Sequence, residues 1–456
     1  MQRRFNMSAL ALACAIVCLP AAAQTLTLQQ AYTAALSQDA TLRASRAQAD
    51  VGREALPQAT ARMLPNVSMN IGRSKENLDS TNLDPAATLP PTNRSYVSDS
   101  RVLTIRQPVL RMSELANIRQ AGARVAEAEA NLEKDTQNLA VRVCEAYFEL
   151  LLADEQINLV AAQRAAYSTQ LAAAERGFAA GSGTRTDADE VRARLDLNAA
   201  DELQARQHRL VALKQLRTMV KTPFDAVAPL DAATFQPVAP GAADLDTWAA
   251  RAEHNSPEIK AAQAQLEAAR QEVSKAKGQH LPTLDLVANI SRSENDSIDR
   301  IGSRYNSKSV GFQLNIPIYS GGAVNSAVRQ ARADETRVDA TLDALKSDLG
   351  VRVFKEFSSV TEGALRIAAL QQAVKSSEQV VLSNRKSFAA GSRTTVDVLN
   401  AEQQRVTALR DLAQARYLYL ISGVRLAVLA GAFDTAQLQR LNQYFAVTLA
   451  GGMPLR

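Results

Sequence analysis

The chain has 456 residues, of which 46% are hydrophobic and only 5% aromatic, and its formal net charge is +5. This charge is too small and too dispersed to indicate binding to nucleic acid. The three histidines, His208, His254 and His280, are scattered and accompany no metal-binding or nucleophile motif, so neither an enzyme nor a metal or cofactor site is expected.

Residues 1–23 have the pattern of a secretory signal peptide. Two arginines precede an apolar run from Ala9 to Leu19, which ends in a proline and three alanines. We predict cleavage after Ala23, at the end of these small residues. The apolar run is too short to remain as a membrane-spanning helix. Two of the three cysteines lie in this segment, so Cys144 remains alone and no internal disulfide is expected.

A helix and then a β-hairpin are predicted next. Apolar residues recur at helical spacing over residues 28–62, and Leu64-Pro65 ends the pattern because the residue before a proline is pushed out of the α region. Over residues 67–71 the period changes to alternation, which is typical of a strand. A polar loop and a return strand over residues 97–106 complete a hairpin at about 64–108.

The same order recurs as a helix over 245–280 and a hairpin at about 282–317. The apolar face of the second hairpin comprises Leu284, Leu286, Ala288, Ile290, Val310, Phe312, Leu314 and Ile316, and its polar face comprises Asp285, Asn289, Ser291, Gln313 and Asn315. This alternation fits transmembrane strands with apolar side chains toward lipid. A half-buried hairpin of a soluble domain is the alternative, but two such hairpins in an exported chain favour the membrane.

Each hairpin is followed by a long helical pattern without proline, over 110–176 and 322–386, which would extend on the order of 100 Å at 1.5 Å per residue. A helix about half as long follows each one, over 187–220 and 395–430. The helix at the start of each repeat is also about half as long as the long helix, so the two shorter helices placed end to end match its length. We therefore predict a rod with two helical columns per repeat and four per chain.

The turn between the long and the short helix has the same sequence in both halves. Phe178–Ser182 and Phe388–Ser392 both read FAAGS, and they lie 210 residues apart. Glycine in each copy can adopt the positive φ that ends a helix, so each copy is predicted to join two antiparallel helices. The chain is therefore a tandem duplication, with repeat 1 over 24–222 and repeat 2 over 245–430.

Four strands per chain cannot close a membrane barrel, because about eight are needed and open strand edges are costly in lipid. The predicted fold class is mainly α with a transmembrane β part. Three tandem-repeat protomers would form one β-barrel of twelve strands and one α-helical barrel of twelve columns. The proline-rich segment 223–244 and the C-terminal tail 431–456 are expected outside the rod, near its equator.

The signal peptide, the duplicated layout and the stretch Ala390–Gln404 (AGSRTTVDVLNAEQQ) resemble the TolC family of outer-membrane export channels. The resemblance implies a homotrimer in the outer-membrane lipid of a Gram-negative bacterium, extending into the periplasm. It also implies two partners, namely a periplasmic adaptor protein and an inner-membrane ABC, RND or MFS transporter. Such a channel exports proteins by type I secretion or small toxic compounds by multidrug efflux, without catalysis.

The resemblance also assigns site residues. The pore constriction falls on Asp397, Asn400 and Glu190; the gate latch falls on Asp187, Arg393 and Phe388; and the hairpin turns for adaptor docking contain Gly181, Ser182, Gly391 and Ser392.

Two of these positions depart from the family pattern. Phe388 replaces a tyrosine, which removes a latch hydroxyl, and Asn400 replaces an aspartate, which removes three charges from a trimeric ring. We expect Glu190, at the equivalent position of repeat 1, partly to replace this charge. We also expect Arg393 to pair with Asp187 in the closed state. Alternatively, the acids are ordinary helix-capping residues.

A soluble periplasmic coiled-coil scaffold is the second hypothesis for the whole chain. It would share the long helices but would not need pairs of alternating strands. Fractionation of the outer membrane and trimer mobility distinguish it from a channel.

Overall fold

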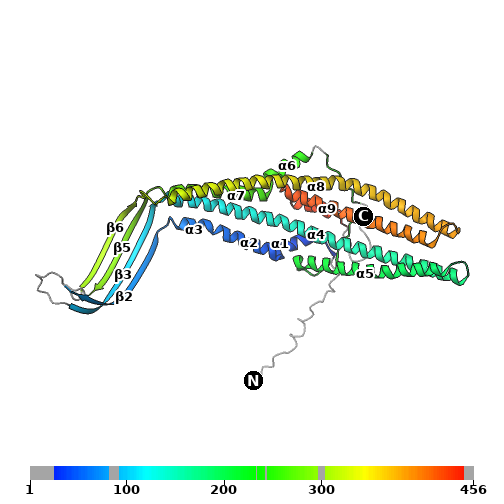
Figure 1. Ribbon diagram of the computed structural model, residues 1–456, viewed down its shortest axis with the longest axis horizontal. Coiled ribbons are helices and arrows are strands. Elements are labelled where there is room, and N and C mark those ends of the chain that lie inside the picture. The colour runs from blue at the N-terminus through cyan, green and yellow to red at the C-terminus, as the bar shows by residue number, and fades with distance from the viewer. Residues whose placement is uncertain (1–24, 82–91, 233, 242–243, 296–302, 446–456) are drawn as a thin grey trace, which may run out of the picture. The chain divides into compact units, whose positions relative to one another are not determined.

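A computed structural model of the chain describes residues 25–81, 92–232, 234–241, 244–295 and 303–445 (Figure 1). The predicted signal peptide, the prolines of the first hairpin loop and the end of the tail lie outside these residues. The described helices are α1 (Leu28–Gln38), α2 (Ala40–Arg53), α3 (Ala55–Ala61), α4 (Met112–Ala179), α5 (Arg185–Val220), α6 (Asp244–Asn255), α7 (Pro257–Gly278), α8 (Ala323–Ala389), α9 (Thr395–Leu429) and α10 (Thr435–Asn442). The described strands are β1 (Thr25–Leu26), β2 (Asn66–Ser80), β3 (Thr92–Leu110), β4 (Ala226–Val227), β5 (Thr283–Asn295) and β6 (Ser303–Asn315).

The described residues divide into two compact units, which we treat separately. The first contains residues 25–44, 134–256 and 348–445, and the second contains residues 45–133 and 257–347. In the part of the chain that the structure describes, no helix combines the length and the hydropathy that a bilayer-crossing helix requires.

The second unit contains a four-stranded antiparallel sheet in the order β2-β3-β5-β6 (Figure 1). The central pair, β3 and β5, joins the two hairpins, with Leu103 opposite Ile290. In the second hairpin Leu286 lies opposite Phe312, and Asp285 lies opposite Gln313. Because opposed residues of a ladder share a face, the register places these leucines, Ile290 and Phe312 on one, mainly apolar face, and Asp285 and Gln313 on the other, mainly polar face. The separation is incomplete, because Gln107 lies opposite Leu286 on the apolar face.

The apolar face of this sheet is exposed within the chain. Phe312 is 72% exposed and Val310 is 76% exposed, and Val67 and Met69 on β2 are also exposed. The outer strands β2 and β6 each have one strand neighbour among the described residues. As far as the described residues go, the sheet therefore has an uncovered apolar face and two open edges.

An ion pair on the polar face fixes the sheet to the start of α4. Arg111 donates to both carboxylate oxygens of Asp285, at 3.0 and 2.6 Å. Asp285 is only 7% exposed, so this bidentate pair is largely removed from water. Nearby, Thr104 donates a 2.9 Å hydrogen bond to Asn289 across β3 and β5.

Two helical hairpins dominate the first unit, α4 with α5 and α8 with α9 (Figure 1). Both FAAGS turns have glycine in the left-handed region, with φ of 72° at Gly181 and 77° at Gly391. The following backbone amides return to the helix end, since Ser182 donates to Gly177 at 2.9 Å and Ser392 donates to Ser387 at 3.0 Å. The repeated pentapeptide therefore has the same turn geometry in both repeats.

The prediction of single helices over 28–62 and 245–280 was wrong. The first segment breaks at Asp39, whose backbone is extended (φ −62°, ψ 127°), and again at Glu54. The Asp39 carboxylate accepts a 2.8 Å bond from the backbone of Leu42 and a 2.9 Å bond from Arg142, so a contact with α4 fixes this break. The second segment breaks before Pro257, which begins α7.

The inter-repeat segment and the tail meet in the first unit. β4 pairs in parallel with β1, and Leu230 forms an isolated bridge with Phe445. Tyr147 of α4, which is fully buried, places its hydroxyl 3.1 Å from the carbonyl oxygens of Leu26 and Ala228. The ring of Phe445 in the tail lies 5.6 Å from that of Tyr147, so both segments contact the middle of α4, whereas their position near an equator stays a prediction.

Candidate functional site

The candidate site lies where α5 and α9 begin, directly after the two FAAGS turns. Thr184 and Thr394 are the N-caps of these helices, and each side chain accepts a hydrogen bond from a backbone amide three residues later. Asp187 and Asp397 complete the two capping boxes, because each carboxylate accepts a bond from the backbone of its threonine, at 3.2 and 3.0 Å. The two repeats thus place an acid at the same point of the same local motif.

Asp187 also links the two repeats. The buried side chain of Thr395, in the first turn of α9, donates a hydrogen bond to the Asp187 carboxylate. The hydrogen bond from the Thr184 side chain, together with that from Thr395, lowers the pKa of Asp187 below its usual value. Asp187 is therefore an anion that holds the starts of α5 and α9 together.

Asp397 has a different partner. Arg393 lies 3.6 Å from its carboxylate, and both side chains are partly exposed. Hydrogen bonds from the backbone and side chain of Thr394 lower the pKa of Asp397, and the Arg393 charge contributes further. Among the described residues no ion pair joins Arg393 to Asp187, so the latch between these two residues stays a prediction.

Arg194 connects the two other predicted constriction residues. Its guanidinium lies 3.3 Å from the Glu190 carboxylate and 3.5 Å from the side-chain oxygen of Asn400. Sequence reasoning missed Arg194, although Glu190 and Arg194 have the i,i+4 spacing of a helical ion pair. The structure thus brings Glu190 and Asn400 of the two repeats together through a cation.

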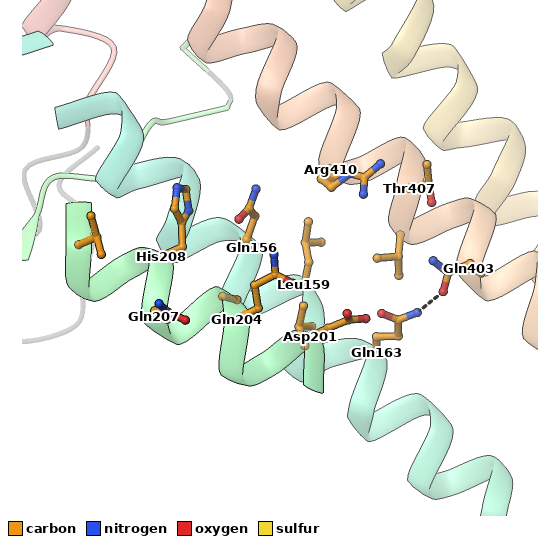
Figure 2. Close-up of a pocket in the computed structure, with 14 residues that line it drawn as sticks. Gln156, Leu159, Gln163, Asp201, Gln204, Gln207, His208, Gln403, Thr407 and Arg410 are labelled. Carbon is orange, nitrogen blue, oxygen red and sulfur yellow. Dashed lines mark hydrogen bonds between the residues drawn. The ribbon is translucent and has the colours of Figure 1, made fainter. Parts of the chain in front are cut away.

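An apolar cluster and a polar cluster connect the repeats further along the same helices. Tyr167, Val191 and Leu399 pack as one buried group from α4, α5 and α9. Beside it, Gln163 donates to Tyr167 at 2.8 Å and to Gln403 at 2.7 Å. Figure 2 shows the side chain of Gln163 on α4 directed toward Gln403 on α9.

The Glu402 carboxylate, only 3% exposed, lies within one repeat between two arginines. Arg385 of α8 donates to one of its oxygens, and Arg405 donates to the other at 3.1 Å. The equivalent pair of repeat 1, 210 residues earlier, is Glu175 with Arg192 at 2.7 Å. The same cross-hairpin ion pair thus occurs in both repeats with its charges exchanged.

A cavity of about 610 Å³ opens beside the polar cluster between α4, α5 and α9 (Figure 2). Its lining combines amide and charged side chains, such as Gln156, His208 and Arg410, with apolar ones, such as Leu159 and Val406. Within the described ranges no group of three or more His, Cys, Asp or Glu side chains is arranged to hold a metal ion. The chemistry of these residues is that of hydrogen bonding and charge, which suits a passage or an interface.

Comparison with known proteins identifies a family. A model of the family described as "Outer membrane efflux protein" matches residues 31–220 and 248–432. The two matched ranges correspond to the two repeats and leave out the whole inter-repeat segment 223–244.

Two curated relatives and one solved structure are similar over most of their length. The chain is 31% identical to the proteases secretion protein PrtF of Dickeya chrysanthemi, over 93% of this chain and 92% of PrtF. It is 32% identical to the alkaline protease secretion protein AprF of Pseudomonas aeruginosa, over 94% of this chain and 89% of AprF. The crystal structure of CusC has the same fold, with a TM-score of 0.77 and 15% identity over 89% of this chain and 92% of CusC.

Proposed function

The chain belongs to the outer membrane efflux protein family, and we propose that it is the outer-membrane channel of a type I protein secretion system. The resemblance to outer-membrane export channels that the sequence indicated is thereby confirmed, and the soluble scaffold is not supported. The observation that carries the proposal is the similarity to PrtF and AprF, two proteins named for protease secretion, over more than nine-tenths of the chain. A secreted protease is therefore the first substrate class to test.

The active form in this proposal is a homotrimer. Three sheets closing edge to edge would satisfy the open edges of β2 and β6, and outer-membrane lipid would cover the apolar face. Helix surfaces also support assembly, because Leu203 and Leu210 of α5 are 67% and 63% exposed in the single chain. Val351 and Phe354 of α8 are exposed to a similar extent, at 66% and 58%. Contacts between copies would bury these side chains.

The proposed partners are a periplasmic adaptor protein and an inner-membrane transporter. An ABC transporter is the expected class for protein secretion, whereas RND or MFS transporters would accompany efflux. We place the docking surface for the adaptor at the two turns that contain Gly181, Ser182, Gly391 and Ser392. The matching geometry of the two turns supports this, because a trimer would then offer six similar turns to the partner.

The proposed constriction is a ring of Asp397, supplied once by each of three copies. Its capping box fixes the carboxylate at the start of α9, and its lowered pKa keeps it ionised at neutral pH. Three carboxylates around a narrow axis would attract cations. In the closed state Arg393 would hold adjacent helices through Asp187, while Phe388 cannot supply a hydroxyl for this purpose.

Deletion of the gene in the source bacterium tests the proposal. Proteins that accumulate in the culture medium of the parent, a protease activity above all, should disappear from the medium of the mutant and return with the restored gene. Susceptibility to toxic compounds is measured in parallel. Unchanged secretion together with greater susceptibility would reject the secretion assignment and identify the chain as an efflux channel.

A further inference from the structure

We propose that Arg194 is a charge-setting residue of the constriction, which neutralises Glu190 and binds Asn400 of the second repeat. As a result, this level of the passage has no net acidic charge. The inference rests on the proposed function, because it requires Asn400 to line the pore.

Arg194 places a positive charge beside Glu190 and Asn400, where the sequence indicated further acidic charge in the constriction. Arg194 lies between Glu190, four residues earlier on α5, and Asn400 on α9. Its side chain is 34% exposed and that of Glu190 is 39% exposed, so both charges remain accessible to ions in solution. A guanidinium 3.3 Å from a carboxylate cancels most of its field at longer range. Glu190 therefore does not replace the charge that Asn400 lacks.

The same side chain also connects the repeats. Asn400 offers a neutral oxygen to Arg194, so the link between α5 and α9 is a hydrogen bond without a second carboxylate. The charge at this level of the passage and the link between α5 and α9 can thus be changed separately. Asn400→Ala removes the link and keeps both charges, whereas Arg194→Ala removes both the link and three positive charges per trimer.

Arg192 provides a matched control. It lies two residues from Arg194 on α5, but its guanidinium pairs with Glu175 of α4 within the same hairpin, at 2.7 Å. Its side chain is 53% exposed, so its removal is tolerated at least as well as that of Arg194. Arg192→Ala thus removes an arginine charge from another face of the same helix and is the reference for Arg194→Ala.

The experiment is the measurement of reversal potentials in planar bilayers under a KCl gradient, on full-length trimers of matched gel mobility. Arg194→Ala should raise the cation-to-anion permeability ratio about twofold or more, because Glu190 and Asp397 are no longer opposed by this cation. Arg194→Lys and Arg192→Ala should leave the ratio at the value of the parent protein. Glu190→Gln should lower it, and the double change Arg194→Ala with Glu190→Gln should return it to the parent value.

The variants distinguish a failure of this inference from a failure of the proposed function. If Asp397→Asn lowers the ratio but Arg194→Ala does not change it, the channel stands and the role of Arg194 is rejected. If Arg192→Ala changes the ratio as much as Arg194→Ala, the effect is one of total charge and the inference is also rejected. If the protein forms no channel at all, the proposed function fails, and this inference fails with it.

Discussion

The side-chain amide of Gln163 on α4 donates a 2.7 Å hydrogen bond to the side-chain oxygen of Gln403 on α9. The two residues are 240 positions apart in the sequence and belong to different repeats. Gln163 is 6% exposed and also bonds Tyr167, so the contact extends a buried polar cluster out to α9. The two hairpins are therefore joined by side chains that no local sequence pattern brings together.

Gln403→Leu should weaken this junction without removing the apolar cluster beside it. Gln163 keeps its bond to Tyr167, but the Gln403 oxygen accepts from both Gln163 and the Tyr167 hydroxyl, at 2.7 and 3.3 Å. Two hydrogen bonds are therefore lost, which corresponds to about 1–3 kcal/mol of unfolding free energy. Urea unfolding of the detergent-solubilised protein measures the loss. Gln404→Leu, at the exposed neighbouring position, is the control and should have no effect. Equal losses in both variants would show that these bonds contribute nothing.

The register of the sheet predicts which strand positions accept a charge. Leu286 and Phe312 are directly opposed on the apolar face, so arginine at either position should cost roughly 2–4 kcal/mol near the midplane of a bilayer. Gln313→Arg should be tolerated, because this residue lies on the polar face opposite Asp285. Heat-resistant trimers in outer-membrane fractions are the measurement. Trimers with arginine at Phe312 would contradict the orientation of the sheet toward lipid.

The ionisation of Asp397 predicts how selectivity depends on pH. Its pKa is lowered below the usual value by the hydrogen bonds from Thr394 and by the Arg393 charge, so the carboxylate becomes protonated at a lower pH than an ordinary aspartate does. The capping bonds from Thr394 that favour the anion are likewise lost only as the pH falls through that lowered pKa. The difference in permeability ratio between the parent protein and Asp397→Asn should therefore persist to a lower pH than it would for a carboxyl group with the usual pKa. A difference that already disappears at a higher pH would show that the capping bonds do not hold in the trimer.

Local patterns predicted most of the elements. The FAAGS pentapeptide alone indicated the two turns, because a glycine with positive φ after a helix is a local requirement, and alternation indicated the strands. The break at Asp39 could not be predicted in this way. Its apolar neighbours keep helical spacing across the break, and the contact that fixes it comes from Arg142, 103 residues away.

The candidate site likewise contains some residues that local sequence patterns identified and others that they did not. Asp187 and Asp397 were identifiable because each follows a threonine at capping-box spacing and because the family resemblance places function there. Thr395 and Arg194 were missed as partners, since each meets a residue of the other repeat about 200 positions away. Contacts between repeats depend on how the hairpins pack, and sequence periodicity does not specify that packing.

Arg393→Ser should raise single-channel conductance. Arg393 contacts Asp397 at 3.6 Å at the start of α9. Its loss would also remove the cation of the proposed latch with Asp187, while the acidic ring remains. The permeability ratio should shift toward cations in the same recordings, because Asp397 loses its nearest positive charge. Arg185→Ser is a suitable control, since Arg185 lies close after the other FAAGS turn, at the start of α5, and its side chain is 82% exposed. Conductance unchanged by Arg393→Ser would remove this residue from the gate.

The ion pairs with exchanged charges in the two repeats predict that substitutions at equivalent positions lower the free energy of unfolding by unequal amounts. Glu402 of α9 is 4% exposed at its side chain and binds Arg385 and Arg405, so Glu402→Ala leaves two guanidinium groups without their shared carboxylate. Because the side chains of Arg385 and Arg405 are themselves 55% and 25% exposed, water can solvate them, and the loss of a charged hydrogen-bond partner costs about 1.5–3 kcal/mol. The equivalent change in repeat 1, Arg192→Ala, breaks a pair whose side chains are 53% and 50% exposed, and such surface pairs contribute about 0–1 kcal/mol. Denaturant unfolding of both variants measures the difference, and Glu402→Gln, which keeps a hydrogen-bonding oxygen, should fall between them. Similar losses for Glu402→Ala and Arg192→Ala would show that the buried cluster does not stabilise its hairpin more than the exposed pair does.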